Sequence, residues 1–484
     1  MTGLMTPDRG KRYASDTIQQ VQHRLTKSYT SAPRRTALFV FLGVLKALLL
    51  VSWLVSRQQP KSVSAVPTDI QQAQEVRKAI APLASLHAAF SGKDAGARNQ
   101  SFENIQNDIL WRDTEGNVIQ AHGGSVLFHE GVYHLYGEHK GGRTLPPGSG
   151  KPPSIVHRVD VIGVSCYTST DLINWKYEGL ALPAGQHSDL DPSKVVERPR
   201  VLYHEPTQRF VMWMHIDTGD YELARCGMAT SPSATGPYRY LRSFRPHAQM
   251  CRDFTVFKDD DGEAYIAYSS ERNKVMHVAR LTQGYTNVAM TFTRTMVGLS
   301  REAPAIFKHR DIYLMITSGC TGWQVNRAEV YFARDPLGEW ESLGSPCVSR
   351  SHMLRETTFY SQGTHVLPMP GQPGRYVFMA DRWLPQALGM SRYIWLPLWV
   401  VDIPQAVESP LRGAVHAQQR SIKRNKFRSM RPGPTNMQSL PPVDVVVRWQ
   451  QRWNLTVLDA PPPLCADLLR SQSEAVLRDG ECAI

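Results

Sequence analysis

A short two-strand pattern that occurs five times constrains the fold of this chain more than any other feature. In each copy, alternating apolar residues lead into a turn of Gly, Asp, Pro or His-Arg-Asp, and a stretch rich in Tyr, Phe and Trp follows. Such a pattern predicts a β-hairpin. The copies start roughly 50 to 75 residues apart, a spacing that suggests the blades of a propeller. They cover residues 125–139, 200–216, 255–270, 305–319 and 365–382.

A second pattern alternates with the first. Residues 167–179, 228–241 and 331–343 each contain a strand, then a turn of Ser, Asp, Pro or Gly, then an aromatic strand. Because this pattern keeps step with the hairpins, we interpret it as the outer strands of the same blades rather than as hairpins of a sandwich. The sequence therefore predicts an all-β, five-bladed β-propeller.

A polar side chain stands four or five positions before the first apolar residue of every hairpin. The innermost strand of each blade lines the central channel of a propeller, so equivalent positions on five such strands converge at one mouth. The resulting pocket gathers three carboxylates, an amide and an imidazole. Carboxylates that face each other across a pocket are typical of glycoside hydrolysis. These residues are His122 (with Gln120 nearby), Glu197, Asp253, Glu302 and Gln362.

The net charge of +12 raises the possibility of a nucleic-acid partner, so its location matters. Residues 1–36 carry a net charge of +5 and residues 403–443 a net charge of +6, which leaves the hairpin region close to neutral. Charge runs of this kind are usually solvated tails. We therefore expect no nucleic-acid partner.

Residues 37–55 form an apolar run that is long enough to span a bilayer and is interrupted only by Lys46. Basic residues are dense before the run and sparse after it, so the positive-inside rule places residues 1–36 in the cytosol. The sequence predicts a single-pass type II signal anchor, with the rest of the chain in the lumen of the secretory pathway or outside the cell. An apolar core helix or a cleaved leader is the alternative.

The domain boundaries follow from these patterns. Residues 56–104 read as a stem, 105–458 as the propeller, and 459–484 as a tail. The basic, Pro-rich residues 403–443 form an insertion in the last blade or in its closure.

Seven cysteines would face an oxidising compartment under this topology, where disulfides persist. The odd number leaves at least one thiol free or paired with another chain. Cys465 with Cys482 is a plausible pair, although pairing cannot be deduced from sequence. Asn99 and Asn454 stand in glycosylation sequons.

Several long stretches of the chain resemble glycoside hydrolase family 43, and in particular its exo-β-1,3-galactanase branch. The resemblance runs from about residue 105 to 402 and resumes at 445–458. The matching stretches include residues 120–138, 163–183, 197–217, 236–271, 301–323 and 373–383.

The resemblance implies a five-bladed propeller that inverts the anomeric carbon with three acidic residues. Asp253, in CRDFTVF, matches the residue that modulates a pKa, and Glu302, in REAPAIF, matches the general acid. The base of the family is an Asp in the first blade, but AHGGS (121–125) offers none, as in the galactanase branch. The group that activates water stays open.

The remaining channel residues have more than one interpretation. Glu197 could bind sugar hydroxyls, orient a catalytic group or act as the base, with a structural carboxylate of the channel as the alternative. We hypothesise that Gln362, helped by Glu197, holds the attacking water, and the alternative is that Gln362 only binds a substrate hydroxyl. His122 and Gln120 could contact substrate or serve structure alone. Trp323 and Trp383 are candidates for stacking on a pyranose ring, with buried core Trp as the alternative, and Tyr221 is a weaker candidate for sugar binding.

Structural alternatives also exist for the charged residues. Glu302 could be a surface carboxylate beside Arg301, Asp253 could pair with Arg252, and Arg382 could pair with Asp381. The DDDG at 259–262 lacks the ligand spacing of a calcium loop and reads as a turn. We expect no cofactor and no metal.

These observations favour a membrane-anchored enzyme that releases terminal galactose from β-1,3-galactan, as in arabinogalactan-type glycans, with inversion. Two alternatives stay open. One is another specificity of the same family, such as arabinofuranosidase or xylosidase. The other is a catalytically inactive propeller that binds glycans.

Overall fold

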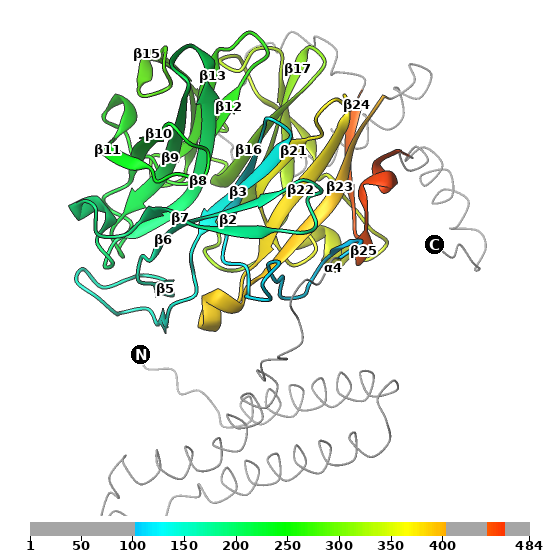
Figure 1. Cartoon of the computed structure of the whole chain (residues 1–484). Helices are drawn as coiled ribbons and strands as arrows, with labels where there is room; N and C mark the ends of the chain where they lie inside the picture. The colour runs from blue at the N-terminus through cyan, green and yellow to red at the C-terminus, as the bar shows by residue number, and fades with distance from the viewer. Residues whose placement is uncertain (1–101, 403–442, 460–484) are drawn as a thin grey trace, which may run out of the picture. The chain divides into compact units, whose positions relative to one another are not determined.

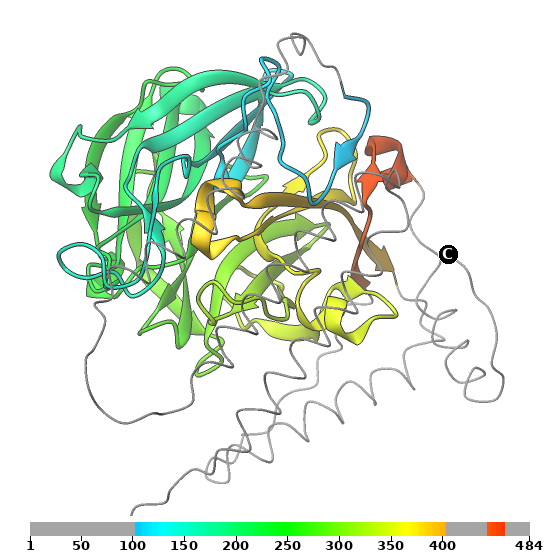
Figure 2. The ribbon, with the colours of Figure 1, turned by 90° about the horizontal axis from the view of Figure 1, so that it is seen from below.

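Five β-sheets surround a common axis in the computed structural model of the chain (Figure 1). The structure describes residues 102–402 and 443–459. The innermost strand of each sheet lies beside the innermost strands of the two neighbouring sheets, so the sheets close into a ring. Figure 2, turned by 90°, shows the sheets arranged around the centre. The predicted all-β, five-bladed propeller is confirmed.

The first three blades are four-stranded antiparallel sheets, and in blade I a pair of short strands is inserted between the second and third strands. From the channel outward, blade I contains β2 (His122–His129), β3 (Val132–Glu138), β6 (Gly163–Ser169) and β7 (Lys176–Pro183). Blade II contains β8 (Val195–His204), β9 (Arg209–Asp217), β10 (Arg225–Ser231) and β11 (Arg239–Phe244). Blade III contains β12 (Phe254–Lys258), β13 (Ala264–Ser270), β14 (Val275–Leu281) and β15 (Val288–Thr295).

The last two blades follow the same plan, with one strand added to blade V. Blade IV contains β16 (Arg301–His309), β17 (Ile312–Gly319), β18 (Glu329–Ala333) and β19 (Glu341–Gly344). Blade V contains β21 (Gln362–Pro368), β22 (Arg375–Arg382), β23 (Arg392–Asp402), β24 (Val443–Arg448) and, parallel to β24, β20 (Cys347–Val348). Since β23 pairs with β24, residues 403–442 connect two neighbouring strands of this blade.

Short elements complete the described part of the chain. The two small sheets pair β1 (Ile105–Gln106) with β25 (Arg452–Trp453), and β4 (Thr144–Leu145) with β5 (Arg158–Val159). The helices are η1 (Ser188–Leu190), η2 (Glu205–Thr207), η3 (Pro246–Ala248), α4 (His352–Glu356), η4 (Pro385–Met390) and η6 (Leu455–Asp459).

The core lies between the blades because each blade presents an apolar face to its neighbour. Trp213 of β9, for example, packs in one cluster with Ile266 of β13. Blades V and I share one apolar cluster, which includes Trp395 of β23. Asn107 donates from Nδ2 to the Trp395 carbonyl (2.8 Å) and accepts from the Trp395 amide (2.6 Å). Trp453 Nε1 donates to the same carbonyl (2.8 Å). Residues from both ends of the described range therefore stabilise blade V.

A bulge recurs at the start of three innermost strands. The strand register shifts just after His122 in β2, Glu197 in β8 and Glu302 in β16. The next residue in each strand is Gly123, Arg198 or Ala303, and all three have a left-handed φ of +52° to +57°. Because a bulge re-aims the side chains beside it, the polar residues at these positions turn toward the same end of the channel.

Among the described residues, no helix has the length and apolarity needed to cross a membrane. The predicted anchor (37–55), the stem, the C-terminal tail, Asn99, Cys465 and Cys482 lie outside those residues. Asn454 is half-buried.

One disulfide, which the sequence did not predict, joins Cys226 to Cys251, so that β10 is tied to the segment just before Asp253. Cys166 and Cys347 are buried free thiols, and Cys320 is an exposed one.

Candidate active site

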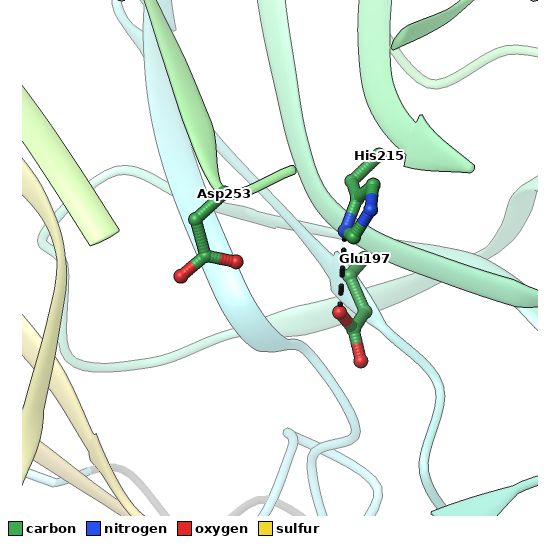
Figure 3. A group of neighbouring side chains, drawn as sticks. All are labelled: Glu197, His215 and Asp253. Carbon is green, nitrogen blue, oxygen red and sulfur yellow. Dashed lines mark ion pairs between the residues drawn. The ribbon is translucent and has the colours of Figure 1, made fainter. Parts of the chain in front are cut away.

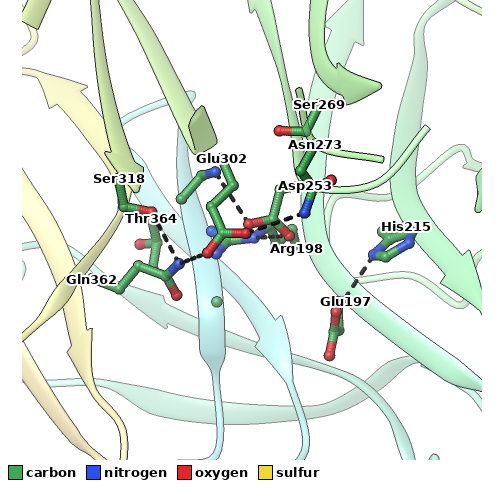
Figure 4. Close-up of polar contacts among 12 residues, drawn as sticks. Glu197, Arg198, His215, Asp253, Ser269, Asn273, Glu302, Ser318, Gln362 and Thr364 are labelled. Atoms are coloured by element: carbon green, nitrogen blue, oxygen red, sulfur yellow. Dashed lines mark hydrogen bonds and ion pairs between the residues drawn. The ribbon is translucent and has the colours of Figure 1, made fainter. Parts of the chain in front are cut away.

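The polar residues of the innermost strands lie at one end of the channel, together with the loops that leave the second strand of each blade. These five loops follow β3, β9, β13, β17 and β22, and they frame the mouth of the channel. Figure 4 shows the side chains that meet there. The loops occupy residues 139–162, 218–224, 271–274, 320–328 and 383–391.

Glu302 lies near the start of β16, with 8% of its surface exposed. Its Oε1 accepts a hydrogen bond from Gln362 Nε2 (3.2 Å), and its Oε2 accepts one from Asn273 Nδ2 (3.4 Å) (Figure 4). Burial raises the pKa of Glu302 to about 8, the charge of Asp253 adds to the rise, and Arg198 opposes it. At neutral pH the carboxyl is therefore mostly protonated, as a general acid must be. The reading of Glu302 as a surface carboxylate is wrong.

Asp253 directly precedes β12 and is held by two neighbouring strands. Its Oδ1 pairs with Nε of Arg198 (2.8 Å), and its Oδ2 accepts from the backbone amide of Ala303 (3.1 Å). Because Ala303 follows Glu302 in the chain, Asp253 fixes the backbone that carries Glu302. Arg252 instead donates to the Tyr221 carbonyl (2.8 Å), so the alternative that Arg252 pairs with Asp253 is wrong.

Glu197 is held as an anion by its neighbours. Tyr221 donates to its Oε1 (3.0 Å), and His215 Nδ1 lies 3.4 Å from its Oε2 (Figure 3). Burial opposes ionisation, yet His215 and Lys140 lower the pKa of Glu197 to about 2. The other nitrogen of His215 lies 2.8 Å from Asp217. Burial would lower the pKa of His215, but the two carboxylates raise it to about 10.

Glu197, His215 and Asp253 also form a possible cation site, because their ligand atoms lie within 4.8 Å of one another (Figure 3). The chemistry of the set does not suit a metal. The two carboxylates raise the pKa of His215, so a metal would have to displace its proton, and Arg198 and Lys140 already pair with Asp253 and Glu197. We assign these residues to the charge network of the mouth.

Gln362 connects Glu302 to an aromatic pair. Its Oε1 accepts from the indole of Trp383 (2.9 Å), and its Nε2 donates to Glu302 and to Ser318 (3.1 Å). Because an indole N–H only donates, the orientation of the amide follows from the network. Trp383 meets Trp323 edge-to-face with ring centroids 4.9 Å apart, and both rings are half-buried. The indole of Trp323 donates to the His157 carbonyl (3.1 Å).

His122 is fully buried and is held by blade V. Its Nδ1 lies 3.0 Å from Asp381, and its ring stacks on Tyr393 at 5.0 Å. Gln120 is buried beside it, where Nε2 donates to the Gly389 carbonyl (2.9 Å). The expected alternative that Arg382 pairs with Asp381 is wrong, because Arg382 pairs with Asp108 and Asp381 with His122.

The structure thus brings Glu302, Asp253 and Gln362 into one network. Glu197 and Tyr221 join it through blade II, and Trp383 and Trp323 through the loops of blades V and IV. Gln120 and His122 lie at the seam of blades I and V.

Several polar residues of the mouth were missed by the sequence reasoning. Most lie at the end of a second strand or just after it, so the hairpin repeat that located the inner positions could also have located these. They are Glu138, Lys140, Arg198, His215, Asp217, Asn273, Ser318, Cys320 and Asp381.

Comparison with known proteins identifies relatives of this arrangement. The sequence profile of "Glycosyl hydrolases family 43" matches residues 156–378. No curated protein sequence matches the chain.

Solved structures match over most of the propeller. A β-1,3-galactosidase of the family is 33% identical, with a TM-score of 0.59, and the match covers 74% of this chain and 65% of that one. A second β-1,3-galactosidase, solved with galactodeoxynojirimycin, is 36% identical (TM-score 0.57), with 72% of this chain and 100% of that chain covered. An exo-β-1,3-galactanase from Phanerochaete chrysosporium, solved with galactose, is 35% identical (TM-score 0.54; 61% and 64% covered).

Proposed function

Since the chain belongs to glycoside hydrolase family 43, in its exo-β-1,3-galactanase branch, we propose that it releases terminal galactose from β-1,3-galactan with inversion. The observation that carries the proposal is the buried Glu302 carboxyl, which stays protonated at neutral pH beside the carboxylate of Asp253. A pocket that only binds glycans has no need of such a pair. The specificity rests on the galactosidases and galactanases that the chain resembles.

Glu302 acts as the general acid in this proposal. It donates its proton to the oxygen of the departing sugar, so that this oxygen leaves as a hydroxyl. Asp253 keeps the proton on Glu302 until the leaving oxygen takes it, because a second ionisation beside an existing negative charge is unfavourable. Arg198 and the Ala303 amide hold the Asp253 side chain in place beside Glu302.

Gln362 and Glu197 orient the attacking water. Inversion requires water on the face of the sugar opposite the acid, with carboxyl groups typically about 6.5–9.5 Å apart. Gln362 Oε1 has one lone pair left after its bond to Trp383, and this lone pair can accept from water. Glu197 is an anion and a second acceptor, although a pKa of about 2 makes it a weak base.

The substrate contacts come from the loops of the mouth. Trp383 and Trp323 offer half-buried rings for the C–H face of a pyranose. We assign hydroxyl recognition to Tyr221, His122 and Gln120, which lie at the two ends of the network. The unpartnered Nε2 of His122 and Oε1 of Gln120 are buried polar atoms that a hydroxyl or a water can satisfy.

The full chain, produced in a secretory host, tests this proposal. It is incubated with β-1,3-, β-1,4- and β-1,6-linked galacto-oligosaccharides and with aryl arabinofuranosides and xylosides, and the products are followed by NMR. We expect α-galactose from the β-1,3 substrate alone, and loss of this product in the Glu302→Gln variant. Binding without turnover would favour an inactive glycan-binding propeller, and turnover of arabinofuranosides or xylosides alone would favour another specificity of the family.

We also propose a lumenal or extracellular location for the propeller, reached through a type II anchor at 37–55. The Cys226–Cys251 disulfide suits an oxidising compartment. The test is protease protection of the propeller in sealed microsomes, combined with a mobility shift on removal of N-glycans. Digestion of the propeller without detergent would contradict this location.

A further inference from the structure

The longest of the five mouth loops, which we call the strap (residues 139–162), connects β3 to β6 in blade I. It contains the β4–β5 pair, in which Leu145 lies opposite Arg158. Its tip is internally bonded, because the Gly148 amide donates to the Ser154 carbonyl (2.8 Å) and the Ser154 amide to the Ser149 carbonyl (2.8 Å). The strap is therefore a structured segment of the mouth. Figure 1 shows β5 at the lower end of the propeller, where the short gold helix η4 also lies.

The strap is fixed to the mouth loops of three other blades. Toward blade II, the Ile155 amide donates to the Gly219 carbonyl (3.0 Å). Toward blade V, the Leu388 amide donates to the Thr144 hydroxyl (2.9 Å). Blades II and V are the neighbours of blade I in the ring, so these two bonds run along the rim.

The third bond joins blades that are not neighbours. The indole of Trp323, in the loop of blade IV, donates to the His157 carbonyl of the strap (3.1 Å). Because blade V separates blade I from blade IV, this bond requires the strap to reach across part of the mouth. Trp323 lies only three residues after Cys320. The side-chain Nδ2 of Asn273 is 3.2 Å from Cys320 Sγ and also donates to Glu302. The anchor of the strap is thus close to the general acid.

A sugar in the interior of a galactan chain is linked to further sugars on both sides, so it can reach Glu302 only if the mouth is open in two directions. We propose that the strap, anchored on Trp323, blocks one of these two directions and thereby restricts hydrolysis to the free end of the chain. The inference rests on the proposed function and assigns its end specificity to these residues. Ile155 at the tip, 62% exposed, offers an apolar surface to the bound chain.

The test compares two forms of β-1,3-galactotetraose and of linear β-1,3-galactan. One has a free non-reducing end, and the other carries a 3-O-methyl group on that end to mimic the continuing chain. The main variant replaces residues 146–157 with Asn-Gly. This two-residue turn suits the antiparallel pairing of Leu145 with Arg158, and it removes both Ile155 and His157.

Wild-type protein should bind and cleave the free-ended substrates and ignore the capped ones. In the shortened variant we expect the ratio of capped to free-ended hydrolysis to rise by about tenfold or more, with internal fragments among the products, since a steric barrier has been removed. Calorimetric binding of the capped tetraose to Glu302→Gln proteins with the intact and the shortened strap gives a readout that needs no turnover. A folded shortened variant that still excludes capped substrates overturns the inference.

A second pair of variants covers failure of the shortened variant to fold. Trp323→Phe keeps an aromatic ring but loses the bond to His157. Trp340→Phe is the matched control, because it loses an indole bond to the Pro336 carbonyl (3.0 Å) in the same blade. The ratio of capped to free-ended hydrolysis should rise in Trp323→Phe only, and an equal ratio in both variants would overturn the inference.

Failure of the wild-type protein to cleave any galactoside, while capped substrates are still excluded from binding, would remove the proposed function and leave the strap as the barrier. If no form binds either tetraose, both proposals are wrong.

Discussion

Gln362 donates a hydrogen bond from Nε2 to Oε1 of Glu302 at 3.2 Å, although the two residues belong to neighbouring blades. The side-chain amide of Gln362 also accepts a hydrogen bond from Trp383, so two hydrogen bonds connect an indole in the loop of blade V to Glu302, the proposed general acid. The orientation of the Glu302 carboxyl and the position of the Trp383 ring are therefore linked through the Gln362 side chain.

Replacement of Glu302 by Gln should lower kcat on β-1,3-galactotriose by about a hundredfold to ten-thousandfold, because general acid catalysis contributes that much. An aryl galactoside, whose leaving group needs little protonation, should lose less. Steady-state kinetics on the two substrates checks this expectation. Equal losses on both would argue against the acid role.

The same variant should change the dependence of stability on pH. Glu302 has a pKa of about 8 in the folded protein against 4.5 as the ordinary value, so the folded state holds a proton that the unfolded state has lost between these pH values. Its contribution to stability is complete below about pH 4.5 and is lost as pH rises through 8. Relative to wild type, Glu302→Gln should gain Tm between pH 5 and pH 9, as measured by calorimetry. A constant difference across this range would contradict the raised pKa.

Removal of the charge of Asp253 should move the alkaline limb of the pH–rate profile. Burial is the main cause of the raised pKa of Glu302, and Asp253 adds to it. In Asp253→Asn the acid should therefore ionise below pH 8, and Arg198, freed from its partner, lowers the pKa of Glu302 further. The profile of kcat/KM should fall at lower pH than in wild type. A limb that stays in place would show that Asp253 does not act on the acid.

His215 should stabilise the fold most at acidic to neutral pH. Its pKa is about 10 in the folded protein against 6.5 as the ordinary value, so its contribution is complete below about pH 6.5 and is lost as pH rises through 10. His215→Gln should cost about 3 kcal/mol near pH 6, because Asp217 and Glu197 lose their buried partner. Urea unfolding at pH 6 and pH 10 measures the difference, which should shrink at the higher pH. A larger cost at pH 10 would be contrary to this assignment.

Trp383→Phe should lower kcat by about fivefold through one lost hydrogen bond, since such a bond contributes about 1 kcal/mol. The variant keeps the ring but leaves Gln362 Oε1 without its donor. We expect KM to change less than kcat, because the C–H contact of the ring remains. A rise in KM alone would make Trp383 a substrate platform and nothing more.

The fold was predictable because each blade repeats the same local sequence pattern. Alternating apolar residues around a turn specify a hairpin within some fifteen neighbouring residues, and five such hairpins have few ways to bury their faces except against one another. The positions of Glu197, Asp253, Glu302 and Gln362 followed from the same repeat, since residues at equivalent strand positions meet at one end of the channel. The roles of the acid and its modulator came from resemblance to a family.

The partners of those residues were not predictable. The sequence offered Arg252 for Asp253 and Arg382 for Asp381, because adjacency along the chain was the only guide, whereas the structure pairs Asp253 with Arg198 and Asp381 with His122. The Cys226–Cys251 disulfide and the contact of Asn273 with Glu302 likewise join segments from different strands.

By itself, then, the sequence determined the hairpins, their number and the polar residue that each one brings to the channel, because these depend on local alternation and turn chemistry. Tertiary structure alone decided the charge state of that pocket and the shape of its mouth. The pKa of Glu302 depends on burial and on the charges of Asp253 and Arg198, and the strap meets Trp323 because blades I and IV belong to one ring. Both are properties of distances between blades, which no local pattern encodes.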